Sequence, residues 1–544
     1  MELLLTVLTL LAAIYAVIPR ERQLDLRLRV RTLDWAVIIL ASTAVLYLEF
    51  FDFCEAHGWI FSSRPWPDGI TPQNTIYLVM VVAVIFVGLR IRFAHLTTGN
   101  IRKFRELVEE LYWSQSFGEL FAMLQTHRKE LFRIYDSDYF LARLQRQMQP
   151  LSSFEEFLLE ARPNDTKPKG MRVSKRVLAL LRPFNWILSG VLPEYSQAQE
   201  TARELVRAIF LSPRFVEALA RTRPYLGLEM IRTAKPSFER YDFAELYLKA
   251  LLSDPQSVFY TEIRNNQNII KGSRYVIPES NPLIHFFLAD VHVAENMKVY
   301  KPIGDFIESH LDDLARDHEN DPYNRAMGDF DEAEVWHSPV FAGTRFFDVM
   351  VKEALFQGIE WHMWLYYMPP IVERIVRNYR LCDPLPDQEA EFPIRYSYLL
   401  HQIFTCMADW VMAVEEVPPD QPNVVLGPVG PELDNGNIPK SSLIALSQST
   451  QCILESPHIG RRLKRTLACK TFNIYFDLRR SGRYSGYAET LLSLITQIRG
   501  YQPVNDVRRR DALMRIFQEE KSEYRITRPE QHVNDLEFAL GKTS

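Results

Sequence analysis

Three arginine–histidine pairs in this sequence have a spacing suited to acid–base cleavage of RNA. Such cleavage needs one side chain that holds the phosphate and one that moves a proton. The pairs with four to six intervening residues are Arg90/His95, Arg395/His401 and Arg525/His532. Because the chain has twelve histidines, composition alone yields about three such pairs. Arg395 and His401, which open a predicted helix, are the weak catalytic candidates.

A second group of residues could bind a metal ion. His285, His292 and Glu295 are spaced i, i+7 and i+10, so they share one face if 284–296 is a single helix. Imidazole and carboxylate ligands on facing helices do form metal centres in helical bundles. The spacing departs from the Glu-x-x-His pattern of those centres, and hydrogen-bonded core histidines explain the same residues. These three residues are therefore weak metal-ligand candidates.

Other motifs for cofactors and catalysis are incomplete. The closing "LGKTS" lacks the first glycine of a phosphate loop, because Leu536 stands at that position. Residues 321–332 begin and end like a calcium loop, but Tyr323, Arg325 and Ala326 supply neither the ligand oxygens nor the glycine turn. The chain has no Gly-x-Ser-x-Gly or His-Glu-x-x-His motif. We therefore predict no cofactor.

The elements that would position these residues follow three apolar N-terminal segments. A helix needs about 20 apolar residues to cross roughly 30 Å of hydrocarbon, with about 17 as the lower limit. Residues 3–19 carry no charge, residues 35–51 carry only Glu49, and residues 69–89 carry none. We predict transmembrane helices at about 3–19, 35–51 and 72–89. A cleaved signal peptide is disfavoured because the chain begins Met1-Glu2 and lacks a small-residue cleavage site.

The charges between these segments indicate their orientation. Basic residues are retained on the cytoplasmic side of a membrane. Residues 20–34 hold five arginines against three acids, 52–68 hold one arginine against three acids, and 90–105 hold only basic charges. The N-terminus is therefore predicted outside and the C-terminal bulk in the cytoplasm, in a multi-pass protein of an inner or plasma membrane whose first partner is the lipid bilayer.

The first cytoplasmic connection contains "LDLRLRVR" (24–31), which alternates with period two as a strand does. One reading lays it flat on the membrane, with Arg27, Arg29 and Arg31 on anionic head groups. The other is a turn followed by a frayed helix end. The sequence does not decide between them.

The region after residue 93 is predicted to be predominantly all-α. Apolar residues recur at three- and four-residue steps, and Ser212-Pro213 is a typical helix start. The best strand-like runs are 257–263 and 274–277. A Pro/Gly-rich stretch at 417–439 looks like a linker. We therefore expect a transmembrane region (1–93), a helical domain (94–416), this linker and a basic helical domain (440–544), without a fixed-period repeat.

The near-neutral total charge hides two oppositely charged segments. The formal net charge is −5, but residues 290–334 sum to −9 and residues 456–515 to +9. Either the segments contact each other or solvent, or the basic one holds anionic lipid or, less plausibly beside a membrane, nucleic acid. The residues for such contact are Arg461, Arg462, Lys464 and Arg465.

Three classes of function are compatible with this sequence. The first is a non-enzymatic interaction or sensor protein that is anchored in a membrane and binds a protein partner or a second copy of itself. The second is an oligomeric effector or channel, favoured by small residues at Ala12, Ala16, Ala41 and Ala44 but weakened by the lack of charge at mid-depth. The third is a membrane-tethered helical nuclease or hydrolase, with Arg395 and His401 as its candidates.

Overall fold

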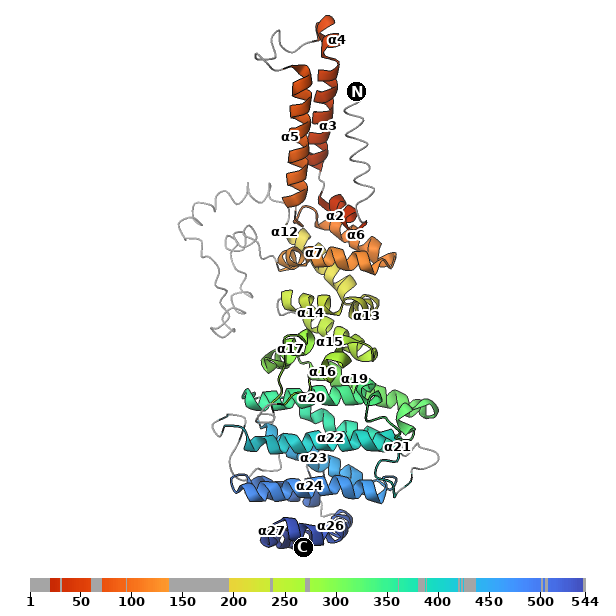
Figure 1. Ribbon diagram of the computed structural model, residues 1–544, viewed down its shortest axis with the longest axis vertical. Helices are drawn as coiled ribbons and strands as arrows, with labels where there is room; N and C mark the ends of the chain where they lie inside the picture. The colour runs from red at the N-terminus through yellow and green to blue at the C-terminus, as the bar shows by residue number, and fades with distance from the viewer. Residues whose placement is uncertain are drawn as a thin grey trace. The chain divides into compact units, whose positions relative to one another are not determined.

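The structure, a computed structural model, is largely all-α (Figure 1). It divides into two compact units: the first runs to Leu219 and includes Glu229–Arg240, and the second holds Ala220–Leu228 and the chain from Tyr241 onward. In the described part, the only strands are β1 (Ile498–Arg499) and β2 (Gln502–Pro503), which pair antiparallel. The described residues are 20–29, 32–59, 71–93, 95–136, 195–234, 238–269, 274–360, 362–379, 387, 389–418, 421, 424, 437–499, 502–503 and 507–541.

The first unit contains an apolar helical hairpin formed by α3 (Thr32–Glu49) and α5 (Pro72–Phe93), with the short α4 (Phe51–Ala56) at its tip (Figure 1). The seam between α3 and α5 buries Val45, Leu48 and Ile76. The outward sides of both helices are also apolar. Most of the exposed large apolar side chains among the described residues lie on this hairpin and its tip. A helix that is apolar on every side favours an apolar surrounding.

In the described part of the chain, no helix is by itself both long enough and apolar enough to span a membrane. Gln23–Arg29 and Asp34–Glu49 meet that condition only as a pair, across a bend of 88°, and the apolar run Pro72–Phe86 is shorter than a span. Of the three predicted spans, 35–51 and 72–89 coincide with α3 and α5. The predicted span 3–19 lies outside the described residues.

The arginine-rich connection folds as a helix, α2 (Arg20–Arg29), so its strand-like alternation is misleading. Leu24 and Leu28, one turn apart, are buried, and α2 packs against α5, α6 (Ile101–Trp113) and α7 (Phe117–Tyr135). The sequence alternates only because arginines flank these leucines. Period two and period 3.6 are hard to separate in a stretch this short.

A polar contact holds α2 on α7. The buried imidazole of His127 lies 2.8 Å from an Asp25 carboxylate oxygen, and Arg29 lies 2.8 Å from the other one. Burial would raise the pKa of Asp25, but the hydrogen bonds with His127 and Arg29 outweigh it and lower that pKa below its usual value. The ionised carboxylate therefore links the connection before α3 to the helices after α5.

The first unit continues with α12 (Tyr195–Leu205), which packs on α6 and α7 and passes directly into a π-helical turn, η3 (Val206–Phe210). Ser212-Pro213 was predicted to start a helix, and α13 (Pro213–Thr222) confirms it. The helices that follow are α14 (Pro224–Thr233), α15 (Phe238–Ser253), α16 (Val258–Asn265), α17 (Pro282–Leu288) and α18 (Val291–Asn296).

The rest of the second unit is a stack of helices in two layers. In one layer α19, α21, α23 and α25 contact each other in order, and in the other α20, α22, α24 and α26 do so (Figure 1). Successive hairpins therefore stack as they do in helical-repeat proteins, although no fixed sequence period marks them. The helices are α19 (Tyr300–Arg316), α20 (Pro339–Phe356), α21 (Met368–Tyr379), α22 (Arg395–Met412), α23 (Ile438–Glu455), α24 (Arg461–Ser481), α25 (Ser485–Gln497), α26 (Val507–Thr527) and α27 (Glu530–Gly541).

Two glycines bring the first helices of the stack unusually close together. A Cβ atom at Gly343 of α20 would overlap the Ile307 side chain of α19, and one at Gly304 of α19 would overlap the Tyr367 ring. Gly304 and Ile307 are both buried. The close contacts of α19 with α20 and with Tyr367 therefore depend on glycine at positions 343 and 304.

Helix starts in the stack follow local chemistry. Ser338 precedes α20 and accepts a hydrogen bond from the Phe341 amide at 3.2 Å, and Asn437 precedes α23 and accepts one from the Lys440 amide at 3.0 Å. Both helices have proline in the first turn, where its missing amide costs nothing. The predicted linker ends where α23 begins, and α23 packs on α21 and α22, so the helices on either side of it share one unit.

Three local predictions need correction. The strand-like run 257–263 is helical, as α16, because a short apolar run does not distinguish the two structures. The run 274–277 is extended only as an isolated bridge between Tyr275 and Ile269. The apolar spacing of residues 346–367 also predicts one continuous helix, which is wrong, because α20 ends at Phe356 and Gly358 adopts φ +68°.

Candidate functional site

A buried cluster of charged side chains lies inside the second unit, between α20 and α22. Asp348 of α20 is completely buried. Its carboxylate accepts hydrogen bonds from the Tyr275 hydroxyl and, at 2.8 Å, from the Trp410 indole, and it lies 3.2 Å from the Lys352 ammonium and 3.3 Å from the Arg345 guanidinium. This group is called the Asp348 network below.

The charges of the Asp348 network compensate one another. Burial alone would lower the pKa of Lys352. The negative charges of Asp348 and Asp409 outweigh burial and raise that pKa above its usual value, so Lys352 is charged. Cys406 lies in the same network, and burial raises the pKa of its thiol to about 12. A thiol of that pKa is a poor nucleophile at neutral pH. The network is therefore an internal polar cross-link between helices, and the chemistry of a catalytic cysteine does not fit it.

The predicted catalytic residues Arg395 and His401 lie on α22 without forming a pair. The Arg395 guanidinium lies 2.6 Å from Glu334 and over the Phe330 ring. The His401 ring instead packs against Phe392, with ring centroids 5.1 Å apart. Six residues along a helix turn the side chains about 120° apart and separate them by about 9 Å. None of the described cavities is lined by Arg395 or His401.

The environment of His401 also disfavours proton transfer near neutral pH. Burial, with the positive charge of Lys470, lowers the pKa of His401 to about 4. Its Nδ1 is buried and has no hydrogen-bond partner among the described residues. General bases work best when their pKa lies near the operating pH. The ring is neutral at pH 7 and acts chiefly as a packed aromatic side chain.

The single helix assumed for the metal candidates is interrupted. α17 ends at Leu288, and Asp290 caps a new helix, α18, by accepting a hydrogen bond from the His292 amide at 3.1 Å. His292 and Glu295 share one face of α18, but His285 belongs to α17 and is separated from them by the break. Within the described residues, no three potential metal-binding side chains gather at one point.

Glu295 is nonetheless in an unusual environment. It is partly buried, and one of its carboxylate oxygens has no hydrogen-bond partner among the described residues. Burial raises the pKa of Glu295 to about 7. At neutral pH this carboxyl group is therefore about half protonated, which is unusual for glutamate.

We expect Glu295→Gln to stabilise the protein at pH 8 and to have little effect at pH 4.5. The folded-state pKa lies above the unfolded value, so folding takes up a proton, and stability falls as pH rises from about 4.5 to about 7. Glutamine has the shape of the protonated acid and removes this dependence. Thermal unfolding at both pH values measures the effect, with the exposed Glu319→Gln as control. An equal shift at the two pH values would contradict the interpretation.

The predicted lipid- or polyanion-binding residues at the start of α24 are already engaged. Arg461 pairs with Glu519, Arg465 pairs with Glu520, and Arg462 lies 3.9 Å from Glu391. They line a cavity of about 580 Å³ in which four carboxylates face three guanidinium groups, so the cavity is not cationic. Lys464 is turned away and donates hydrogen bonds to the carbonyl oxygens of Leu454 and Ser456 at the end of α23.

The acidic segment behaves in the same way. Glu308 and Asp312 of α19 lie 2.9 Å and 3.2 Å from Arg374 of α21, and Asp312 also pairs with Arg377. In the described ion pairs, the two oppositely charged segments do not meet each other. Each is neutralised by the neighbouring helices of its own part of the stack.

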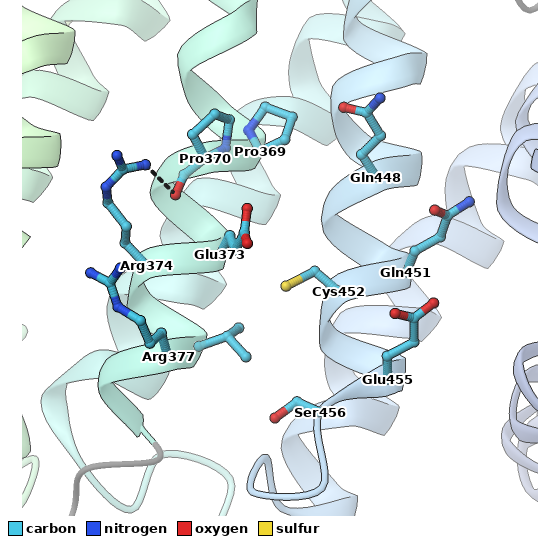
Figure 2. Close-up of a pocket in the computed structure, with 11 residues that line it drawn as sticks. Pro369, Pro370, Glu373, Arg374, Arg377, Gln448, Gln451, Cys452, Glu455 and Ser456 are labelled. Carbon is cyan, nitrogen blue, oxygen red and sulfur yellow. Dashed lines mark hydrogen bonds between the residues drawn. The ribbon is translucent and has the colours of Figure 1, made fainter. Parts of the chain in front are cut away.

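A groove of about 720 Å³ lies between α21 and α23 (Figure 2). It lies between successive helices of one layer. In Figure 2 Arg374 and Arg377 project from α21, and the Cys452 sulfur points from α23 toward α21. Its lining consists mainly of polar and charged side chains, with two prolines at one end: Pro369, Pro370, Glu373, Arg374, Val376, Arg377, Gln448, Gln451, Cys452, Glu455 and Ser456. We call it the α21–α23 groove.

The side chains of the α21–α23 groove suit recognition better than catalysis. Its cations are engaged, since Arg374 bonds to α19 and to the Pro370 carbonyl oxygen at 3.4 Å. On the other wall, Glu455 lies 3.0 Å from Arg509. No histidine lines the groove beside Cys452. It offers hydrogen-bond donors and acceptors of both charges, which fits a polar protein segment.

Sequence reasoning missed both the Asp348 network and the α21–α23 groove. Arg345, Asp348 and Lys352 follow each other at three- and four-residue steps within an apolar helix, which indicates buried charges that need partners. That signal was available. No sequence signal indicated the α21–α23 groove, because the groove forms only when α21 and α23 stack against each other.

Comparison with protein-family models, with curated proteins and with solved structures finds no match to this chain.

Proposed function

We propose that this protein is a membrane-anchored scaffold or sensor without enzymatic activity, whose helical stack binds a protein partner in the cytoplasm. The observation that carries the proposal is the outward apolar surface of the α3–α5 hairpin. Leu40, in the middle of α3, is 73% exposed, and Val82, in the middle of α5, is 56% exposed. Large apolar surfaces of this kind are not left facing water.

The dimensions and the aromatic residues of the hairpin support insertion in a bilayer. At 1.5 Å per residue, α3 is about 27 Å long and α5 about 33 Å, close to the hydrocarbon thickness of about 30 Å. Exposed Trp35 lies at one end of the hairpin, and exposed Trp59 and Tyr77 lie toward the other. Tryptophan and tyrosine are enriched at the two membrane interfaces.

The packing of α2 supports the proposed orientation. α2 precedes α3, and α6 and α7 follow α5, so contact between them requires that they lie at the same end of the hairpin. The Asp25–His127 contact joins them directly. This end carries the arginine-rich connection, and α4 with Asp52 and Glu55 lies at the other end. The basic end would face the cytoplasm.

The stack supports a binding role. Layers of stacked hairpins present extended surfaces that many proteins use to bind partners. The α21–α23 groove supplies a polar recess on one layer, and the candidate catalytic residues do not assemble. These features favour an interaction protein over the nuclease and channel alternatives. Ala41 and Ala44 also lie one turn from the seam residues Val45 and Leu48, so the hairpin itself uses that small-residue face.

The natural cysteines allow the orientation to be tested without mutation. In intact cells, a membrane-impermeant maleimide should label Cys54, at the tip of the hairpin, and spare Cys452 and Cys469 in the stack. All three are at least partly exposed, so permeabilised cells should show labelling of each. Mass spectrometry of the cysteine peptides gives the readout. Labelling of Cys452 or Cys469 in intact cells would refute the orientation, and recovery of the protein in a detergent-free supernatant would refute the anchor.

A further inference from the structure

α2 is docked so that one of its arginines is consumed and another is presented outward. Arg29 is half-buried and lies 2.8 Å from Asp25. Arg27 lies on the opposite side of α2 from Arg29. It is exposed and makes no ion pair with a described residue. Arg20 is also exposed, but it forms an ion pair of 3.4 Å with Glu119 of α7. α2 therefore turns the charge of Arg27 away from the helices on which it packs.

The first turn of α6 adds positive charge beside α2. Lys103 is exposed and has no ion-pair partner among the described residues. Arg102 donates a hydrogen bond to the neutral Gln197 side chain at 2.6 Å and so keeps its charge. Arg105, one turn later, is neutralised by Glu109 and Glu204. The first exposed carboxylate on α6 is Glu106, one turn after Arg102 and Lys103 on the same side of the helix.

These cations lie at the end of the apolar hairpin where α3 begins and α5 ends. α2 contacts α5 and α6, and only seven residues separate Phe93, the last residue of α5, from Ile101, the first of α6. If α3 and α5 are in lipid, as the proposed function requires, then Arg27, Arg102 and Lys103 lie at the level of the cytoplasmic head groups. The bend of 88° between Gln23–Arg29 and Asp34–Glu49 turns α2 across the hairpin axis, along the membrane surface.

We propose that Arg27, Arg102 and Lys103 form a binding surface for anionic phospholipid head groups. Their ammonium and guanidinium groups would bind the phosphodiester and the net negative charge of the lipid. A zwitterionic lipid has the same phosphate but no net charge, so it would be bound more weakly. The inference rests on the proposed membrane anchor and identifies a lipid partner for it.

The test uses the full-length protein in vesicles of phosphatidylcholine containing spin-labelled phosphatidylglycerol or spin-labelled phosphatidylcholine. The fraction of each lipid immobilised at the protein measures selectivity. A cation near the surface favours anionic lipid by about fivefold. We expect a several-fold preference for phosphatidylglycerol that falls toward unity in 1 M salt. The variant R27Q/R102Q/K103Q should lose that preference, while R221Q/R316Q/R480Q, with the same change in net charge on exposed residues of the second unit, should keep it.

Two outcomes would overturn the lipid site: no preference in the wild-type protein, or an equal loss in both triple variants. Neither affects the anchor, which the same vesicles test separately. If the wild-type protein fails to float with pure phosphatidylcholine vesicles, the proposed membrane anchor is wrong. If it floats but shows no preference, only the head-group site is wrong.

Discussion

Replacement of Asp348 by alanine should lower the free energy of unfolding by about 3–5 kcal/mol, because it leaves buried charges without their partner. Lys352 is 3% exposed and would retain only Asp409, at 3.5 Å. The Trp410 indole would also lose its acceptor. The carboxylate of Asp348 holds α20, α22 and the segment at Tyr275 together, so its loss acts on all three.

The matched control is Asp313→Ala. Asp313 forms an ion pair of 2.8 Å with Arg316, but both side chains are more than half exposed. Exposed pairs contribute about 0–1 kcal/mol. The comparison therefore separates burial from charge pairing, because the same substitution removes a carboxylate in each case. Similar losses in the two variants would contradict the account of the Asp348 network.

Cys406 reports opening of the network directly. It is 1% exposed, so a thiol reagent reaches it only when α20 and α22 separate. Since 1.4 kcal/mol corresponds to a factor of ten, a loss of about 3–5 kcal/mol in Asp348→Ala should accelerate labelling of Cys406 by about 10²-fold to 4 × 10³-fold. Mass spectrometry distinguishes this peptide from those of the other cysteines. If Asp348→Ala does not fold, Asp348→Asn, which keeps an acceptor oxygen, should give a smaller acceleration.

The second large effect is expected from aspartate in the middle of the apolar hairpin. Leu40→Asp and Val82→Asp together should reduce the membrane-bound fraction at least tenfold. A charged residue at the centre of a membrane helix costs roughly 2.5–3.5 kcal/mol. In water, by contrast, an exposed leucine or valine can be replaced at a cost within about 0.5 kcal/mol. The variant thus distinguishes lipid from solvent around α3 and α5.

The control substitutions are Ile526→Asp and Phe538→Asp on the last two helices. These side chains are 86% and 66% exposed, at least as much as most of those on the hairpin. They should leave the distribution between membrane and supernatant unchanged after a carbonate wash. Retention of the Leu40/Val82 variant in the membrane would show that these side chains do not face lipid.

Helix content and many helix starts could be predicted because they depend on neighbouring residues. Ser212-Pro213 contains its own start signal, and α13 begins there. The helices of the stack could be predicted singly for the same reason. Their layered arrangement could not, because the lengths of helices and connections vary and no repeat period survives. A stretch rich in proline and glycine looks the same in a sequence whether it separates two domains or connects two helices of one unit. The helices on either side of residues 417–439, α22 and α23, contact each other within one unit.

The candidate sites were harder to predict than the helices. The metal-site prediction for His285, His292 and Glu295 required one uninterrupted helix, but a two-residue break before α18 separates His285 from the other two. Arg461 and Arg465 were read as a basic surface because their partners, Glu519 and Glu520, are more than fifty residues away. Charge counted along a chain cannot show which acids return to meet it. Arg27 kept its predicted exposure only because α2 turns Arg29 inward instead.

The packing of α19 at the start of the stack affects the position of every later hairpin. A methyl group added at Gly304 would overlap several atoms of the Tyr367 ring, so the ring or α19 must shift, whereas one added at Gly343 would meet chiefly the movable end of the Ile307 side chain. Each later hairpin rests on the one before it, so a small tilt introduced there would grow with distance toward α27. We expect natural variation in this protein to spare Gly304, and an engineered alanine at Gly304 to change the angle at which the later hairpins stack on α19.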